Sequence, residues 1–392
     1  MQAILSDETA RNRAFPITGD GRIFLAHAGV SPLPQAVVDA IKRFADEGAR
    51  DIQESPWAME ETLNARKLAA QLIGASASEI ALLGPTALGL SLVANGIDWQ
   101  PGDEIVYYDD DYPANVYPWL NTRNHGVKLV KLKPEWPGVL TWDVVEAALT
   151  ARTRLVTLAS CNFLSGFRID PEGIGRKLHE RGILLCLDGI QTLGAFPLDA
   201  THVDFVSADA HKWLLGPAGA GIFYVKKKHY DLVKPTLLGS WNVISPDFIA
   251  QDEIAFYEGG RRYEPGTLNI PGIVGVAAAL RLLLDIGVEN IGERILHLRA
   301  FLVEEMRALG FELYIEECDL RTDAADANRS GIMTFTHPSA GLNALYHMLL
   351  EHGVTTSLRK NRQGKPLLRF SPHFYNTEDE MLRVVGHVKA QL

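Results

Sequence analysis

FVSADAHKWLLGPAGAGIFYV, residues 205–225, holds two short apolar runs on either side of a lysine and a glycine-rich turn. A second stretch, ILLCLDGIQTLGAF at 183–196, contains another apolar run, which ends at an acidic residue. Runs that are apolar at nearly every position predict strands buried on both faces, as in a mostly parallel sheet covered by helices. These two stretches therefore predict the centre of an α/β fold.

The same alternation of strand and helix extends outward from this centre. Further strand-like runs are EIALLG (79–84), EIVYYD (104–109) and TRLVTLAS (153–160). Between the runs lie amphipathic stretches with apolar residues at helical spacing, such as PEGIGRKLHERG (171–182). The pattern predicts a large α/β domain whose mostly parallel sheet is covered by helices.

After about residue 270 the pattern changes. Two long helical patterns are followed by shorter strands and helices and by a polar stretch that predicts an exposed loop at 318–330. We therefore predict a large domain over 16–270 and a smaller α+β domain over 271–392. We expect residues 1–30 to pack against the small domain and the cleft.

Composition excludes several classes of protein. The 392 residues are 47% hydrophobic and 22% charged, and the net charge of −10 argues against nucleic acid as a partner. No run of eighteen apolar residues and no signal peptide are present, which predicts a cytoplasmic protein without a membrane span. With only Cys161, Cys186 and Cys318 and no CxxC, we expect neither disulfides nor a metal site. The first two cysteines are predicted to be buried, unreactive side chains.

Lys212 directly follows the 205–209 run, an unusual position for a solvated charge. Burial lowers the pKa of a lysine, so that its amine can form a Schiff base near neutral pH. Asp188 ends the neighbouring run, where parallel sheets place their ligands, and its carboxylate can pair with a protonated pyridine nitrogen. Gln191 would reach the phenolic oxygen of such a ring. The alternatives are a surface lysine and a helix N-cap aspartate.

The strand–Asp–x–x–Gln pattern, followed about one β-α-β step later by His–Lys, resembles the class V aminotransferase family of fold-type I enzymes that use pyridoxal 5'-phosphate (PLP). This family includes cysteine desulfurases, kynureninase and isopenicillin N epimerase. The resemblance covers nearly the whole chain, from FLAHAGVSPLP at 24–34 to the last helix. It implies an enzyme that acts on an amino acid, with PLP held at Lys212 and Asp188 beside the ring.

The resemblance also implies a phosphate site. Thr86, with the backbone amides of Thr86 and Ala87, would bind the phosphate at a helix N-terminus, although a simple N-cap is the alternative for Thr86. His211 would donate to the phosphate, and Thr267 would reach the phosphate of a neighbouring subunit in a homodimer. Asp209 stands where cysteine desulfurases usually carry a serine, and because a carboxylate would repel phosphate its role stays open.

Further residues match positions beside the ring and the substrate. Tyr112 would stack on the ring, with proton transfer as a second role. Asn162 would bond the ring oxygen or the substrate, unless it only forms a turn. Arg369 would clamp the α-carboxylate of the substrate, the alternative being a surface arginine on an edge strand. His27 and Gly29 would line the cleft near the substrate.

The reaction is less constrained than the cofactor. Lys212 would remove the α-proton of the amino acid, and transamination is expected as the default of the family. A C–S lyase, an epimerase and a PLP-fold protein that binds without turnover are the alternatives. The intact Lys212, Asp188, Gln191 and Arg369 argue against the last of these.

One departure from the family bears on this choice. Cysteine desulfurases carry a persulfide-forming cysteine shortly before the carboxylate-binding arginine. The corresponding stretch here, TTSLRKNRQGKPLLRFS at 355–371, has none, and Cys318 lies far upstream. Persulfide chemistry of the usual kind is therefore not expected. Substrate and pathway stay open.

Overall fold

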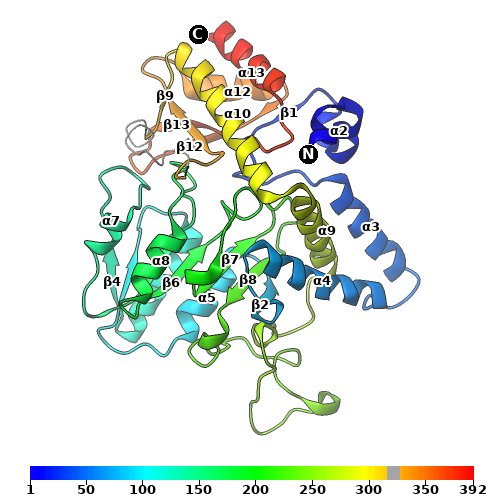
Figure 1. Cartoon of the computed structure of the whole chain (residues 1–392), viewed down its shortest axis with the longest axis vertical. Helices are drawn as coiled ribbons and strands as arrows, with labels where there is room; N and C mark the ends of the chain where they lie inside the picture. Colours follow the sequence, from blue (N-terminus) through cyan, green and yellow to red (C-terminus); the bar gives the residue numbers. More distant parts are fainter. Residues whose placement is uncertain (316–326) are drawn as a thin grey trace.

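A seven-stranded sheet in the order β2-β8-β7-β6-β5-β3-β4 forms the centre of the computed structural model, which describes residues 1–315 and 327–392 (Figure 1). Strands β4, β3, β5, β6 and β7 run parallel, whereas β8 is antiparallel to both β7 and β2. The strands are β2 (Ile80–Leu83), β3 (Glu104–Tyr107), β4 (Lys128–Lys131), β5 (Thr153–Ala159), β6 (Leu184–Asp188), β7 (Phe205–Asp209) and β8 (Gly221–Val225). The predicted α/β fold with a mostly parallel sheet is confirmed.

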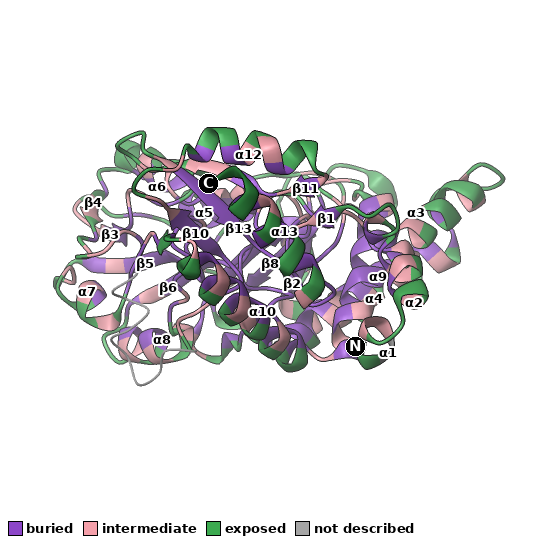
Figure 2. Ribbon diagram, turned by 90° about the horizontal axis from the view of Figure 1, so that it is seen from above, coloured by how far each residue is buried: buried purple, intermediate pink, exposed green. Residues whose placement is uncertain are grey.

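Both faces of this sheet are buried because its strands are apolar on both sides. In β6, Leu185 and Leu187 belong to one hydrophobic cluster and Cys186 to another. The first cluster includes side chains of α4, α8 and α9, and the second those of α5 and α6. Figure 2 shows the buried strands enclosed by helices whose outer faces are exposed. The helices are α3 (Gln35–Gly48), α4 (Pro56–Leu72), α5 (Thr86–Gly96), α6 (Tyr117–Asn121), α7 (Trp142–Glu146), α8 (Pro171–His179) and α9 (Ile270–Ile286).

Strand β4 was not among the predicted strands. Its sequence, KLVK, has an exposed lysine at each end and half-buried residues between them. It pairs only with β3, at the edge of the sheet, and an edge strand does not need two apolar faces. The continuous apolar pattern that identifies central strands is therefore missing here.

A second, antiparallel sheet in the order β12-β13-β10-β9 packs with α10, α12 and α13, which confirms the predicted smaller α+β unit. Its strands are β9 (Glu312–Leu313), β10 (Met333–Thr336), β12 (Ser357–Lys360) and β13 (Pro366–Phe370). Its helices are α10 (Val288–Ala308), α12 (Leu342–Glu351) and α13 (Glu378–Gln391). Cys318 and most of the loop predicted at 318–330 lie outside the described residues.

The N-terminal segment joins this smaller unit. After α1 (Gln2–Leu5) and α2 (Glu8–Ala14), β1 (Ile23–Phe24) pairs in parallel with β11 (Val354–Thr355), and Figure 2 shows the two side by side. Helix α9 contributes to the large hydrophobic cluster, and α10 contributes to the smaller one from Leu298 onward. The domain boundary at 270/271 stays a prediction.

Within the described ranges, no single helix has the length and apolar character to cross a membrane. Helices α9 and α10 are long and apolar enough only when taken as a pair, and the pair is bent by 78° between the two helices.

Candidate active site

Lys212 lies on the turn after β7 and is buried, with 7% of its surface exposed. Its backbone is held from the N-terminal segment: the Ser31 hydroxyl donates to the Lys212 carbonyl oxygen at 2.7 Å, and the Ser31 amide donates to the His211 carbonyl oxygen at 2.8 Å. The residue therefore has a fixed position at the carboxyl end of the parallel strands.

The surroundings of Lys212 favour its neutral amine. Burial, together with the positive charges of Arg369 and Arg359, lowers the pKa of Lys212 to about 8, against an opposing effect of Asp188. A lysine with this pKa has an appreciable neutral fraction near pH 7, which nucleophilic attack on an aldehyde requires.

Asp188 is the last residue of β6 and lies opposite Ser207 of β7, so its carboxylate is at the same edge of the sheet as Lys212. It is 3% exposed, and its Oδ1 accepts a hydrogen bond from the Ile190 amide at 3.0 Å. No arginine or lysine forms an ion pair with it in the part of the chain that the structure describes. Burial raises the pKa of Asp188, and a protonated ring nitrogen would supply the missing cation.

A second buried carboxyl group, Asp111, lies near Asp188 and was missed from the sequence. Its Oδ2 accepts from Asn115 Nδ2 at 3.0 Å. Burial and the charge of Asp188 raise the pKa of Asp111 to about 7. It is the third acid in DDDYP (109–113), and a run of acids after a strand predicts solvated side chains rather than an inward-facing one.

This pair of carboxyl groups makes stability depend on pH. The folded state binds a proton at Asp111 up to about pH 7, whereas the unfolded chain loses it near 3.8. The free energy of unfolding of the cofactor-free protein should therefore fall by about 4 kcal/mol at most between pH 4 and 7 on account of this group. Asp111→Asn should remove that part of the slope in urea unfolding. Exposed Asp252→Asn is the control, and parallel slopes for wild type and Asp111→Asn would contradict the assignment.

The first turn of α5 lies against the end of β7. The Thr86 hydroxyl accepts from the Asp209 amide at 2.9 Å, and the Thr86 carbonyl oxygen accepts from the Ser207 hydroxyl at 2.8 Å. A Cβ on Gly89 would lie 2.4 Å from Ser207 Oγ, so only glycine allows the helix this close. The amides of Thr86 and Ala87 have no acceptor within the helix, and they form a cradle suited to phosphate.

Asp209 is turned toward its own segment. Its Oδ2 accepts from the Gly219 amide at 3.2 Å, and its Oδ1 lies 3.2 Å from His211 Nδ1, without hydrogen-bond alignment. A protonated His211 would offset the charge of Asp209 beside an anion.

Thr267 is exposed and lies two residues before Asn269, whose Nδ2 donates to the Gly219 carbonyl oxygen at 3.2 Å.

An aromatic ring faces Lys212, and the Gln191 amide is held by its neighbour Trp213. The Tyr112 ring centroid is 5.1 Å from Lys212 Nζ, and the ring meets Phe163 edge-on at 5.5 Å. The Gln191 side chain is fixed between Trp213, which donates to its Oε1 at 2.8 Å, and the Ala28 carbonyl oxygen, which accepts from its Nε2 at 3.1 Å. One proton of that Nε2 is left to donate elsewhere.

The structure gives Asn162 a role in a turn. Its Oδ1 accepts from the amides of Leu164 at 3.0 Å and Ser165 at 2.9 Å. The oxygen is thus used by the turn, which favours the alternative interpretation, and only the Nδ2 group remains to meet a ligand.

Arg369 is buried, with 1% exposed, on β13. Its Nη1 donates to the Phe163 carbonyl oxygen at 2.6 Å, its Nη2 lies 3.5 Å from Ser357 Oγ, and its Nε is buried without a partner. No carboxylate pairs with it within residues 1–315 and 327–392. Burial and the nearby Arg359 lower the pKa of Arg369 to about 9. A buried guanidinium of this kind is suited to an incoming carboxylate.

His27 does not lie where the sequence suggested. It is fully buried, its Nδ1 is 2.8 Å from the Ser371 carbonyl oxygen, and its Nε2 is 2.7 Å from the Tyr375 hydroxyl. Both ring nitrogens are engaged, so His27 supports the cleft rather than contacting a substrate, which corrects the expectation. Gly29, two residues on, does lie beside Arg359: a Cβ there would be 3.9 Å from Arg359 Nη2.

The family profile described as Aminotransferase class-V matches residues 23–384. The chain belongs to the class V aminotransferase family. Similar proteins include a probable cysteine desulfurase of Methanothermobacter thermautotrophicus, 26% identical with 94% of each chain covered. Another is the cysteine desulfurase CsdA of Escherichia coli, 29% identical with 96% of each chain covered. The CsdA crystal structure superposes with a TM-score of 0.85 at 25% identity, covering 98% of each chain. The structure of the cystine C-S lyase C-DES, in complex with its product cysteine persulfide, superposes with a TM-score of 0.83 at 23% identity. The match covers 95% of this chain and 98% of that chain.

Class V aminotransferases are PLP enzymes, so the predicted enzyme class and cofactor are confirmed. The described residues fit PLP on three points: a buried amine at Lys212, a buried carboxylate without a cation at Asp188, and free amides at the start of α5.

The cysteines in the described region of this class V chain lie in apolar surroundings. Cys161 and Cys186 are free and fully buried, as predicted. Burial raises the pKa of Cys161 to about 11 and that of Cys186 well above its ordinary value, so both stay protonated. The turn between β12 and β13 contains no cysteine.

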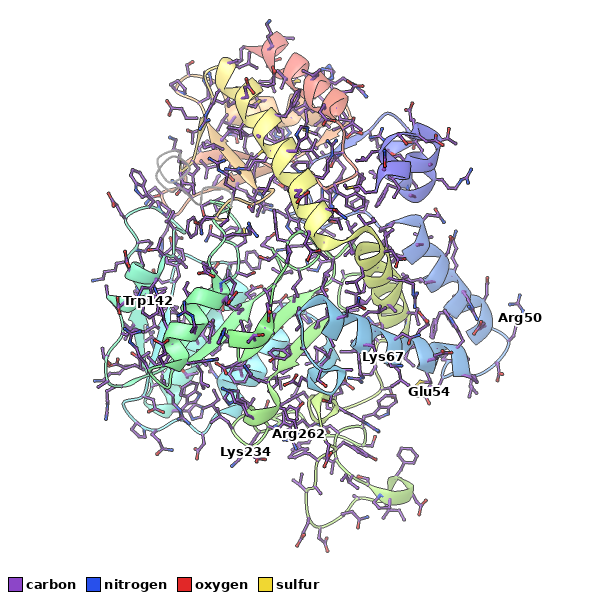
Figure 3. The ribbon with its side chains drawn as sticks, viewed as in Figure 1. Arg50, Glu54, Lys67, Trp142, Lys234 and Arg262 are labelled. Carbon is purple, nitrogen blue, oxygen red and sulfur yellow. The ribbon has the colours of Figure 1, made fainter. Side chains whose placement is uncertain are left out.

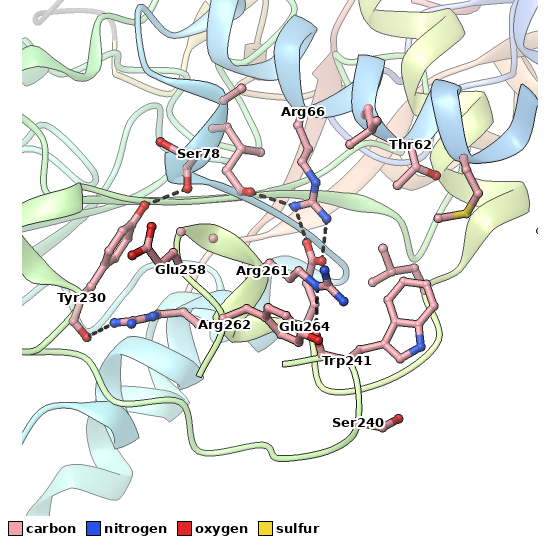
Figure 4. A pocket seen from close by; sticks show the side chains of 18 of the residues that line it. Thr62, Arg66, Ser78, Tyr230, Ser240, Trp241, Glu258, Arg261, Arg262 and Glu264 are labelled. Carbon is pink, nitrogen blue, oxygen red and sulfur yellow. Dashed lines mark hydrogen bonds and ion pairs between the residues drawn. The ribbon is translucent and has the colours of Figure 1, made fainter. Parts of the chain in front are cut away.

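A cavity of about 1060 Å³ lies apart from the site around Lys212, Asp188 and Arg369, and none of these three residues lines it. Arg66 and Glu264 form a two-point ion pair at its wall, with both N–O distances at 2.6 Å (Figure 4). Figure 3 shows Arg262, which also lines the cavity, and Lys234 close to the protruding segment 237–258. The cavity is therefore not part of the catalytic site.

Proposed function

We propose that the chain is a PLP-dependent lyase that breaks the C–S bond of a sulfur-containing amino acid. The observation that carries the catalytic site is the buried, carboxylate-free Arg369 close enough to Lys212 to lower its pKa. The choice of bond follows the relatives named cysteine desulfurase and C-S lyase. They favour the lyase alternative over transamination, the reaction first expected from the family label.

Bound PLP supplies an electron sink that stabilises negative charge at the α-carbon of an amino acid. The Arg369 fork would hold the α-carboxylate and so orient the α-carbon. Lys212, with a pKa of about 8, would accept the α-proton and return a proton to the departing sulfur. Asp188 would keep the ring nitrogen protonated. The C–S bond electrons leave with sulfur, giving a thiol and, after addition of water, pyruvate and ammonia.

We assign the remaining roles from position. The residues that would hold the cofactor are Lys212, Asp188, Gln191, Thr86, Ala87, Tyr112, His211 and, in part, Asn162. No cysteine lies between β12 and β13, which supports release of the sulfur as a free thiol rather than its transfer to a cysteine of the protein.

The test is a product assay of the holoenzyme with cysteine, cystine and S-alkyl cysteines. We expect sulfide from cysteine, a persulfide from cystine and a thiol from S-alkyl cysteines, each in an amount equal to that of pyruvate. Alanine instead of pyruvate would indicate a desulfurase, a pyridoxamine form of the cofactor a transaminase, and an inverted amino acid an epimerase. Binding without any product would indicate a silent protein. Cys318→Ser should leave the rate unchanged, since no protein persulfide is needed.

The predicted homodimer is also part of this proposal. The protruding segment exposes a group of large apolar side chains: Leu237, Leu238, Ile244, Phe248, Ile249 and Ile254. Thr267 is exposed nearby along the chain, as a residue that reaches a neighbouring subunit must be. A second copy of this chain is the partner that would cover this surface. The cytoplasmic location stays a prediction.

A further inference from the structure

Arg359 has no role in the site described so far. In the antiparallel pair of β12 and β13, Ser357 lies opposite Arg369. Opposite residues share a face of a sheet, and so do residues two apart on a strand. Arg359 therefore lies on the same face as Arg369, diagonally across the pair, and Ser357 Oγ, 3.5 Å from Arg369 Nη2, stands beside both.

The Arg359 side chain is half-buried and lies beside the N-terminal wall of the cleft. A Cβ on Gly29 would lie 3.9 Å from its Nη2. Its Nε is buried and has no hydrogen-bond partner. Arg362, at the outer end of the same hairpin, differs: its Nη1 lies 3.2 Å from Asp109 Oδ2, which Lys131 also contacts at 2.8 Å. The outer arginine is paired, whereas no ion pair of the inner one occurs in the described part of the chain.

Three cations thus converge on the cleft. The charge of Arg359 lowers the pKa of both Lys212 and Arg369, which places it close to each. Under the proposed function the α-carboxylate of the substrate offsets Arg369, and Asp188 faces the ring nitrogen. The Arg359 guanidinium is left without a counter-charge, with its buried Nε still free to donate, and such a planar donor group is suited to a second carboxylate.

We propose that Arg359 forms a second anion subsite, which binds a carboxylate carried beyond the sulfur atom of the substrate. The substrate class is then a cysteine whose sulfur bears a carboxylate-containing group, a class that includes cystine. Diagonal positions on paired strands are about 7–8 Å apart, comparable with the span between two carboxylates across a C–S–C linkage. The inference rests on the proposed C–S lyase activity and deepens it.

The test uses two pairs of compounds that differ only in a carboxylate or its amide. For the holoenzyme, kcat/KM is measured with S-carboxymethyl-L-cysteine and S-carbamoylmethyl-L-cysteine. Binding is measured by calorimetry with L-glutamate and L-glutamine, which have no C–S bond. We expect the wild type to favour the carboxylate member of each pair by about 10-fold or more. Arg359→Gln should abolish the preference, and Arg359→Lys should keep part of it.

Two controls separate this subsite from the α-carboxylate clamp. Arg369→Gln should weaken both members of each pair equally, and Arg362→Gln should retain the preference. Equal values for the two members in the wild type would overturn the inference, even if no Arg359 variant folds. Equal weakening of both members by Arg359→Gln would also overturn it, since Arg359 would then share the α-carboxylate. A glutamate preference that depends on Arg359, without C–S cleavage, would uphold the subsite and reject the lyase.

Discussion

Replacing Lys212 with alanine is expected to lower kcat/KM by about 10³-fold or more, because the variant loses its general base and its covalent hold on the cofactor together. The Lys212 side chain is buried and its amine has a pKa of about 8, whereas alanine has no amine at all. Product formation and the visible absorption of the bound cofactor measure the two losses separately. Lys227→Ala, at an exposed lysine, is the control.

A Lys212→Ala protein that kept both the visible band and the activity would place the attachment at another lysine. Loss of activity with a retained band would mean that Lys212 serves only as the base. Circular dichroism should show an unchanged fold, since the backbone contacts of residue 212 with Ser31 and Leu215 do not use its side chain.

The second large effect is expected for Asp188→Asn, which should reduce kcat by about 10²–10³-fold. An uncharged amide cannot hold a proton on the ring nitrogen, and the electron sink weakens. The same change should not destabilise the cofactor-free protein, because it removes a buried carboxylate whose pKa is raised by burial. Steady-state kinetics and urea unfolding of the apoprotein at pH 8 test the two halves.

Opposite effects on function and apoprotein stability distinguish a catalytic carboxylate from a structural one. Asp204 provides the contrast: His179 and His229 contact its two oxygens at 2.8 and 2.6 Å, and these contacts lower the pKa of Asp204. Asp204→Asn should destabilise the fold with little effect on the chemistry. If Asp188→Asn destabilised the apoprotein to the same extent, the assignment of Asp188 would have to be abandoned.

The central strands were predictable because burial on both faces leaves an unbroken apolar run in the sequence. The edge strand β4 left no such run. Asp188 was found from its position at the end of an apolar run and Arg369 through the resemblance. The structure adds that the described residues place no ion-pair partner at the buried guanidinium or at the buried carboxylate.

Three residues show where sequence reasoning stopped. The orientation of His27 depends on Ser371 and Tyr375, more than 340 positions away, so no local pattern could indicate it. Asp111 resembles a surface acid until the fold turns it inward. Arg359 becomes distinct from Arg362 only through strand register and the position of Asp109.

The pairing of β1 with β11 also has a consequence for synthesis on the ribosome. Residues 11–26 are made early, but several of their partners lie at 354–380: Arg11 pairs with Glu380 at 2.7 Å, and Ala26 bridges to Ser371. The N-terminal wall of the cleft must therefore wait until the segment from Val354 onward has been translated, while the parallel strands behind it can already associate. The emerging chain would assemble its cofactor side before its substrate side.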